Sequence, residues 1–378
     1  VDTTAPATPS ITSPTDGATT SDDTPTFLGT AEANATVEVF EGVASLGTTT
    51  ADGLGDWAFT LGSPLSNATY SVTAKATDGA GNTSAASTAI SLTISTVSPE
   101  VTNVSASTAN GSYNAADVIN VTVTFSEAVT VTGTPRLTLA VGGGYAVNYT
   151  SGSGTTTLTF AYTVQSGHTS SDLDYSATNS LALNGGTIKS TATSIDATLN
   201  LASPGAAGSL GANKALVIDT TAPSAPAITS PTDGTTTADN TPSFSGTAEA
   251  NSTVEVFRGG STSLGTATAN GSGAWTITAG VAISDGTYSI TAKATDSADN
   301  TSAASAAISL TIDTAAPAAP SITSPTTGTR TNDTSPVISG SSEANATVEV
   351  FEGSNSLGTT TANGSGAWSL TPGAPLVE

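Results

Sequence analysis

One long pattern recurs at three places in this chain, and it constrains the fold more than any other feature. Residues 2–40 read DTTAPATPSITSPTDGATTSDDTPTFLGTAEANATVEVF, and close variants begin at Asp219 and Asp313. Each copy is followed by a tryptophan that opens a further apolar run, at Trp57, Trp275 and Trp368. Self-similarity of this kind indicates a chain built from copies of one structural unit.

The copies divide the 378 residues into four units. We expect domains at 1–95, 96–218, 219–312 and 313–378. The second unit does not carry the repeat and is longer than its neighbours. The last unit lacks a segment corresponding to 288–312, which supplies two strands in the preceding copy, so we expect open strand edges there.

The strand signals are clearest in residues 219–312. Apolar residues alternate with polar ones, as in Tyr288, Ile290 and Ala292, and turn residues such as Asp-Gly and Asn-Gly separate the runs. The predicted strands cover 226–231, 241–248, 252–259, 263–269, 274–279, 287–295 and 306–313. We expect Trp275 and Phe257 to pack in the core. About seven short strands without helical periodicity predict an immunoglobulin-like β-sandwich.

The second unit has its own strand-like runs, bounded by Gly or Asn. They cover 118–129, 135–141, 145–152, 155–164, 180–188 and 213–219. Gly142–Gly144 is interpreted as a hairpin turn. The fold class expected for the whole chain is therefore all-β, with tandem immunoglobulin-like β-sandwich domains in an extended rod.

The charge balance excludes several classes of partner. The net charge is −23, from 7 basic and 30 acidic residues. Nucleic acid is excluded because phosphate neutralisation requires clustered Lys and Arg. The same deficit disfavours anionic membrane surfaces. No apolar run approaches the roughly 18 residues of a membrane-spanning helix, so we expect no membrane insertion. There is no cysteine, so the domains must be stabilised by their cores or by metal ions.

Four motifs give the chain a family likeness. The D-T-T-A-P linker, the S-G-T-A-E-A-N-x-T-V-E-V-F hairpin, the G-x-W strand and the A-T-D-x-A-x-N-T-S loop resemble bacterial Ig-like repeats of giant adhesins. Such adhesins are exported by type I secretion and include biofilm-associated and RTX-type proteins. Residues 96–218 are similar to another Ig-like or cadherin-like module of such proteins. The resemblance implies a secreted protein at the bacterial cell surface, whose repeats are mostly extenders with the ligand-binding module near one end.

A calcium site is predicted where each repeat begins. In an Ig-type sandwich, the start of the first strand, the second turn and the last loop emerge at one pole. Carboxylate and amide oxygens gathered there suit Ca²⁺, which takes 6–8 oxygen ligands. The expected ligands are Asp219, Glu249, Asp296 and Asn300 in the third unit, Asp2, Glu32, Asp78 and Asn82 in the first, and Asp313 and Glu343 in the last. In the resembling family, calcium at such junctions stiffens the rod. The alternative is that these are solvated turn residues, since Asp and Asn favour turns.

We expect no enzyme. The acidic residues repeat with the domains, whereas a catalytic pair would be singular. No motif of a P-loop, serine hydrolase or zinc protease is present. The single histidine, His168, is interpreted as an exposed loop residue.

Three functions remain open at this point. The first is the stalk of a surface adhesin, stiffened by calcium, that supports adhesion or biofilm formation through a ligand bound outside this region. The second is a glycan- or protein-binding module centred on residues 96–218. The third is an extracellular filament, in which the incomplete last unit self-associates by strand addition.

Overall fold

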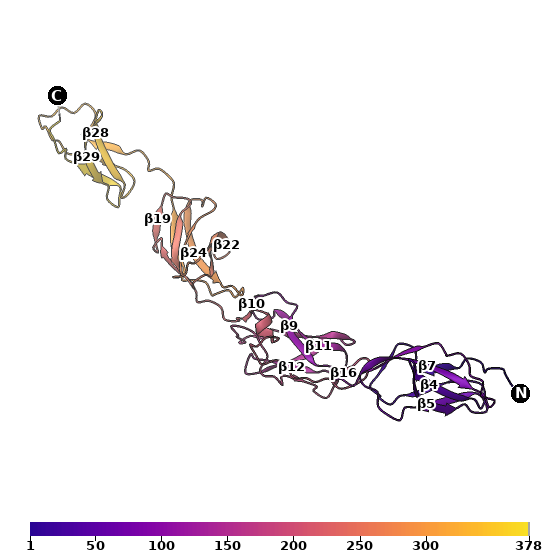
Figure 1. Cartoon of the computed structure of the whole chain (residues 1–378). Helices are drawn as coiled ribbons and strands as arrows, with labels where there is room; N and C mark the ends of the chain where they lie inside the picture. The colour runs from indigo at the N-terminus through magenta and orange to yellow at the C-terminus, as the bar shows by residue number, and fades with distance from the viewer. Residues whose placement is uncertain (377–378) are drawn as a thin grey trace. The chain divides into compact units, whose positions relative to one another are not determined.

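The computed structural model describes residues 1–376 and is nearly all-β (Figure 1). The prediction of an all-β chain is confirmed. By their contacts, the residues form two compact units: residues 1–223 together with 295–301, and residues 224–294 together with 302 onward. Among residues 1–376, no helix is long and apolar enough to cross a membrane.

Residues 10–94 form two sheets, ordered β1-β3-β6 and β2-β8-β7-β4-β5. The strands are β1 (Ser10–Ser13), β2 (Ala18–Thr20), β3 (Thr26–Thr30), β4 (Thr36–Glu41), β5 (Ala44–Thr50), β6 (Asp56–Thr60), β7 (Ala68–Thr77) and β8 (Ile90–Ile94). Buried residues from both sheets, including Phe27, Val39 and Leu92, share one core. Alternation explains this, because every second side chain of a strand faces the other sheet.

A tryptophan lies across a glycine inside each repeat. Trp57 on β6 is the register partner of Gly29 on β3. A Cβ atom at Gly29 would lie 2.5 Å from Trp57 Cζ2 and would overlap the carbonyl oxygen of Ser10. The same arrangement recurs in the pairs Gly246–Trp275 and Gly340–Trp368. Only glycine fits at this position, because any side chain would collide with the tryptophan and the neighbouring strand. This packing explains why the glycine recurs in all three copies.

Residues 101–218 form a seven-stranded sheet, ordered β15-β12-β13-β14-β11-β16 with β9 also paired to β11, and a two-stranded sheet, β10-β17. The strands are β9 (Val101–Ala106), β10 (Gly111–Tyr113), β11 (Val118–Thr132), β12 (Arg136–Leu139), β13 (Tyr145–Ser151), β14 (Thr155–Thr163), β15 (Leu181–Ala182), β16 (Thr187–Ser190) and β17 (Leu216–Ile218). The register of β11 against β14 shifts between Thr124 and Val129. Over the same stretch the partner on its other side changes from β9, which pairs up to Phe125, to β16, which pairs from Val129. The sequence did not predict β9, β10 or the short helix α1 (Leu210–Asn213), which Ser209 caps.

Residues 227–312 repeat the first arrangement, with sheets ordered β18-β20-β23 and β19-β25-β24-β21-β22. The strands are β18 (Ala227–Ser230), β19 (Thr235–Thr237), β20 (Ser243–Thr247), β21 (Thr253–Arg258), β22 (Thr262–Thr268), β23 (Ala274–Thr278), β24 (Gly286–Thr295) and β25 (Ile308–Ile312). All seven predicted strands are present. The eighth, β19, was missed.

The prediction for the two aromatic residues of this repeat is half right. Trp275 is buried in the core. Phe257, however, is only half-buried and lies outside the core cluster. Val254 and Val256 face the core, so the alternation of β21 turns Phe257 to the outer face.

The last group of strands is smaller. It consists of β26 (Ser321–Ser324), β27 (Ile338–Ser341), β28 (Thr347–Glu352), β29 (Asn355–Thr361) and β30 (Ala367–Leu370). Three of them form the sheet β26-β27-β30, and β28 pairs with β29 alone. In residues 313–376 no strand corresponds to β24 or β25. The buried core is correspondingly reduced to Ile338, Val348, Val350, Ala362 and Trp368.

Candidate functional site

The loop between β24 and β25 is closed by its own polar groups. Asp296 Oδ1 accepts hydrogen bonds from the backbone N–H groups of Ala298 (2.8 Å) and Asn300 (2.9 Å). Asp296 Oδ2 accepts a third from Asn300 Nδ2, at 2.9 Å. Below the loop, the hydroxyl groups of Thr295 and Thr301 lie 3.1 Å apart. Local hydrogen bonds therefore occupy both oxygens of the Asp296 carboxylate.

Asn300 also holds the segment that leads into the repeat. Its Nδ2 donates to the main-chain oxygen of Asp219, at 2.9 Å. Asp219 in turn follows β17 directly, and its N–H donates to the carbonyl of Tyr113 at 3.0 Å. The Asp219 carboxylate accepts from the N–H of Thr221 at 2.9 Å. We call the set Asp296, Asn300 and the carbonyl of Asp219 the linker clasp.

The first repeat has the same clasp. Asp78 Oδ1 accepts from the N–H groups of Ala80 (2.8 Å) and Asn82 (2.9 Å), and Asp78 Oδ2 accepts from Asn82 Nδ2 at 2.8 Å. Asn82 Nδ2 donates to the carbonyl of Asp2, at 3.2 Å. The hydrogen bonds from the side chain and backbone of Asn82 lower the pKa of Asp78 below its ordinary value, because they stabilise the ionised form.

The glutamates of the predicted metal sites belong to a turn. Glu32, Glu249 and Glu343 are exposed. Two residues after each, an asparagine has a left-handed backbone: φ is 64° at Asn34, 65° at Asn251 and 63° at Asn345. Asparagine tolerates this conformation better than most residues do. The turn geometry therefore explains the asparagine of the E-A-N motif.

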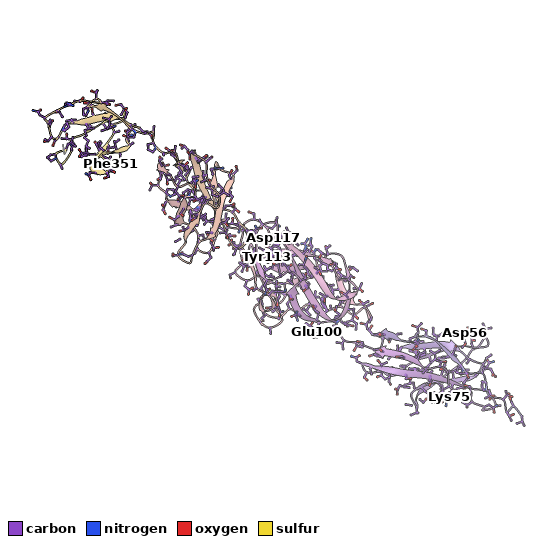
Figure 2. All side chains as sticks on the ribbon, turned by 90° about the horizontal axis from the view of Figure 1, so that it is seen from above. Asp56, Lys75, Glu100, Tyr113, Asp117 and Phe351 are labelled. Atoms are coloured by element: carbon purple, nitrogen blue, oxygen red, sulfur yellow. The ribbon has the colours of Figure 1, made fainter. Side chains whose placement is uncertain are left out.

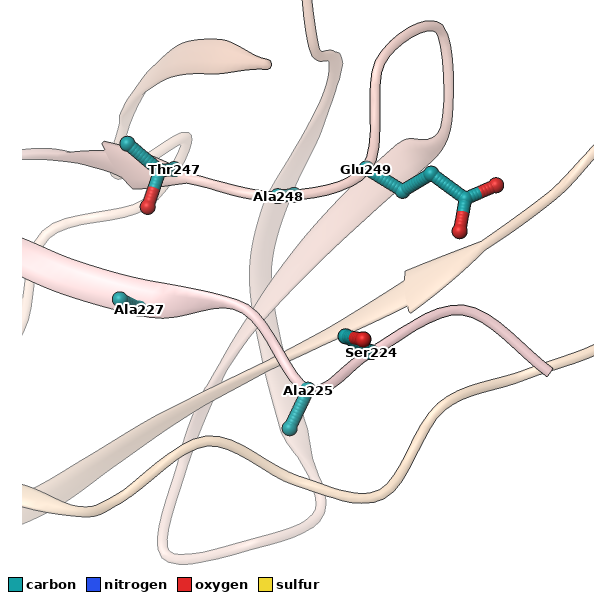
Figure 3. A pocket seen from close by; sticks show the side chains of 6 residues that line it. All are labelled: Ser224, Ala225, Ala227, Thr247, Ala248 and Glu249. Carbon is teal, nitrogen blue, oxygen red and sulfur yellow. The ribbon is translucent and has the colours of Figure 1, made fainter.

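Glu249 borders a shallow surface depression of about 330 Å³ (Figure 3). Ser224, Ala225, Ala227, Thr247 and Ala248 form the rest of its lining. Figure 3 shows the Glu249 side chain extending outward from the turn at one side of this depression. The surface is open and carries a single carboxylate.

The described geometry does not assemble the predicted calcium ligands. Within residues 1–376, no group of three or more His, Cys, Asp or Glu side chains is placed to hold a metal ion. The carboxylates of Asp296 and Asp78 accept hydrogen bonds from local donors, and Asn300 presents an N–H to the linker where a cation would need an oxygen. Asp313 accepts from the N–H of Ala315 at 3.1 Å. Calcium at this pole therefore stays a prediction.

The structure brings His168, Tyr162 and Tyr145 together in a cluster that the sequence did not predict. His168 lies in a loop, as expected, but it is half-buried, so the expected exposure was wrong. Its Nδ1 lies 2.9 Å from the hydroxyl oxygen of Tyr162, and its ring meets that of Tyr145 edge-on at 4.9 Å. Burial raises the pKa of Tyr162 to about 12. No sequence signal marks this cluster, because Tyr145 and Tyr162 come from two different strands, β13 and β14, and His168 comes from the loop after β14.

The three glycines 142–144, all at positive φ, form the predicted turn between β12 and β13.

Comparison with protein families gives one match. The family described as "bacterial Ig-like domain" matches residues 2–96 and 216–314, which together are more than half of the chain. No curated protein sequence matches.

Solved structures superpose on the whole chain only loosely. Domains A168–A170 of titin share 11% identity and cover 81% of this chain and 100% of their own, with a TM-score of 0.30. The BSP domain of a biofilm-associated protein shares 13% identity and covers 84% of this chain and 69% of its own, with a TM-score of 0.23. Native E. coli alpha-2-macroglobulin shares 9% identity and covers 97% of this chain and 38% of its own, with a TM-score of 0.20. Scores this low establish no common structure.

Proposed function

Because this chain belongs to the family of bacterial Ig-like domains, we propose that it is an extender: a run of β-sandwiches that carries a binding module away from the bacterial surface. The role is mechanical, and the parent protein is a secreted or surface-attached adhesin that supports cell adhesion or biofilm formation. Its target is bound by regions outside these residues. The sequence motifs shared with adhesin repeats support this proposal.

One observation carries the mechanical part of the proposal: the linker clasp is present in both complete copies of the repeat. An extender must resist bending where one domain follows another, and a short Pro-containing linker limits bending without abolishing it. Asn300 ties the carbonyl of Asp219 to the loop after β24, at 2.9 Å. A hydrogen bond of this kind contributes about 1 kcal/mol, which biases the linker roughly fivefold toward its clasped form.

Calcium at the same pole stays a prediction. Its support is the sequence pattern of acids and amides, together with the high negative charge of the chain. A cation bound through Asn300 would require the amide oxygen to turn toward the ion, which breaks the hydrogen bond from Asn300 Nδ2 to the carbonyl of Asp219. The clasp and the ion are therefore alternative ways to hold one linker, and a single experiment separates them.

The experiment measures the spread of distances across the linker. The chain has no cysteine, so a spin label at each of two introduced cysteines, Thr156→Cys and Ser261→Cys, reports without interference. Both positions are exposed. Double electron–electron resonance should give a narrower distance distribution for the otherwise unmodified protein than for the Asn300→Ala variant. A change confined to calcium addition or chelation would instead assign the stiffness to the ion.

The chain provides its own matched control. Asn82→Ala removes the equivalent clasp in the first repeat, away from the labelled linker, and should leave the distribution unchanged. If Asn300→Ala and the Asn82→Ala control give the same width as the parent, the clasp does not restrain the linker. The mechanical proposal would then lose its basis.

A further inference from the structure

One five-residue sequence occurs at three places in this chain and adopts two different structures. The sequence T-A-N-G-S covers residues 108–112, 268–272 and 361–365. The first copy runs into β10, whereas the other two form the turns that lead into β23 and β30. Each copy contains an Asn-Gly pair, and all three asparagines are exposed. Any chemical difference between the copies therefore comes from the fold.

The two turns direct several donors at one side-chain oxygen. Asn270 Oδ1 accepts hydrogen bonds from the N–H of Ser272 (2.9 Å), from its hydroxyl group (2.7 Å) and from the N–H of Ala274 (3.0 Å). Asn363 Oδ1 accepts the three equivalent bonds from Ser365 and Ala367, at 3.0, 2.7 and 3.0 Å. Donors at this oxygen draw electrons from the side-chain carbonyl, so its carbon atom becomes more electrophilic.

The backbone nitrogen next to this carbonyl is free and close. In the part of the chain that the structure describes, the N–H of Gly271 donates no hydrogen bond. A Cβ atom at Gly271 would have no heavy atom within 4 Å, so nothing crowds this peptide group. The hydrogen bond from the Ser272 N–H to Asn270 Oδ1 closes a turn whose ring contains both Asn270 Cγ and the Gly271 nitrogen. The turn therefore holds the two atoms near each other.

The copy in the second unit lacks both features. Asn110 Oδ1 accepts a single hydrogen bond, from the N–H of Ala215 at 3.2 Å. The N–H of Gly111 donates to the carbonyl of Ala215 at 3.1 Å. From Gly111 to Tyr113, which Figure 2 labels, the chain is paired with β17. Strand pairing therefore occupies the nitrogen that is free in the two turns.

We propose that Asn270 and Asn363 are sites of spontaneous deamidation, which their own turns accelerate. The Gly271 nitrogen attacks Asn270 Cγ and forms a C–N bond, and negative charge develops on Oδ1, where the donors already lie. Fixed donors at a developing charge lower the barrier, as does placement of the reacting atoms. The bond to Nδ2 then breaks, and ammonia leaves with the proton lost by the Gly271 nitrogen.

Water completes the reaction. It adds to one carbonyl of the cyclic imide and breaks one of the two C–N bonds of the ring nitrogen, which gives aspartate or isoaspartate. The net change is hydrolysis of the side-chain amide, so the reaction needs no oxidant or cofactor. This inference concerns a covalent modification and does not depend on the extender function.

The first repeat shows that such a turn accepts the aspartate product. Asp52 occupies the place of Asn270. Its Oδ1 accepts from the N–H groups of Leu54 (2.8 Å) and Asp56 (3.0 Å), the latter labelled in Figure 2. These hydrogen bonds hold the pKa of Asp52 below its ordinary value, because they stabilise negative charge on that oxygen. Conversion of Asn270 to aspartate would therefore add a charge that the turn can hold.

The test measures the reaction rate at each asparagine of the full chain. The protein is incubated in slightly alkaline buffer made with heavy-oxygen water, and acid digestion with peptide mass spectrometry then follows label uptake at each Asn-Gly pair. Asn270 and Asn363 should react at least about tenfold faster than Asn110 in the folded protein. In urea the three rates should become equal, because the local sequence is the same.

One substitution tests the role of the donors. Ser272→Ala removes the hydroxyl donor of an exposed side chain, so the core stays intact. It should slow the reaction of Asn270 about three- to tenfold. Asn363 in the same molecules is the matched control and should react at its parent rate, and Ser272→Thr, which keeps a hydroxyl group, should restore Asn270.

Three results would each overturn the proposal. The first is that Asn110 reacts as fast as Asn270 in the folded protein, or that Asn270 does not react at all. The second is that the difference between these two residues survives in urea. The third is that Ser272→Ala leaves the rate of Asn270 unchanged.

Discussion

Replacement of one repeated glycine tests how these sandwiches are packed. Gly246 lies on β20, beneath Trp275 and beside β18. A Cβ atom there would lie 2.6 and 2.9 Å from two carbons of the indole ring, where contacts of 3.5–4.0 Å are normal, and would overlap the carbonyl oxygen of Ala227. The backbone of β18 cannot move away without losing its pairing. We expect Gly246→Ala to lower the free energy of unfolding of this repeat by about 2–3 kcal/mol, as overpacking does.

The control is another glycine of the same repeat. A Cβ atom at Gly271 would have no heavy atom within 4 Å, and the φ angle of this residue lies outside the left-handed region. Gly271→Ala should be neutral or stabilise the repeat by up to about 1 kcal/mol, because alanine restricts the unfolded chain. Hydrogen exchange at β24 reports the opening free energy of this repeat alone, which global melting of a multidomain chain does not. Equal exchange rates in the two variants would refute the packing argument.

Three further predictions concern pH, a buried hydroxyl and calcium. The N–H groups of Leu54 and Asp56 hold the pKa of Asp52 below 3.8 in the folded protein, so the unfolded state binds the proton more tightly. The ionised Asp52 therefore stabilises the folded state at neutral pH. This stabilisation is lost as the pH falls from about 3.8 through the lowered pKa. Asp52→Asn should flatten that acid loss in an NMR-monitored titration of the first repeat, and an unchanged profile would contradict it. Ser302→Ala removes the hydroxyl oxygen that accepts the buried N–H of Ala294 at 2.9 Å. It should lower the free energy of unfolding of this repeat by about 1–3 kcal/mol, measured by hydrogen exchange at β24. A decrease under about 0.5 kcal/mol would refute this expectation. If the predicted calcium sites form, about 10 mM CaCl₂ should raise the melting temperature of the protein, and MgCl₂ should raise it less. The reason is that extracellular modules bind calcium with dissociation constants of about 10⁻⁴–10⁻³ M. Identical melting with and without calcium would contradict the predicted sites.

The sequence predicted most strands correctly because their signals are local. Alternation of apolar residues identifies β21 and β24, and Asn-Gly and Asp-Gly pairs mark the turns between strands. The repeat itself established which stretches share a fold. The same local signals failed at Phe257, where an aromatic residue follows two inward-facing valines and lies on the opposite face. They also failed at β19, whose three threonines show no alternation and become a strand only by pairing with the distant β25.

What the acidic and amide residues do was decided by tertiary structure. The sequence placed Asp219, Asp296 and Asn300 at one pole, because the order of strands in a sandwich is fixed by its topology. In the structure, Asn300 donates to both of the other residues. It could not tell whether the Asn300 amide offers its oxygen to a cation or its N–H to a carbonyl. That choice depends on which backbone group the folded linker brings within 2.9 Å. Spacing along a chain determines which residues can meet, whereas only the packed backbone determines which of their atoms do.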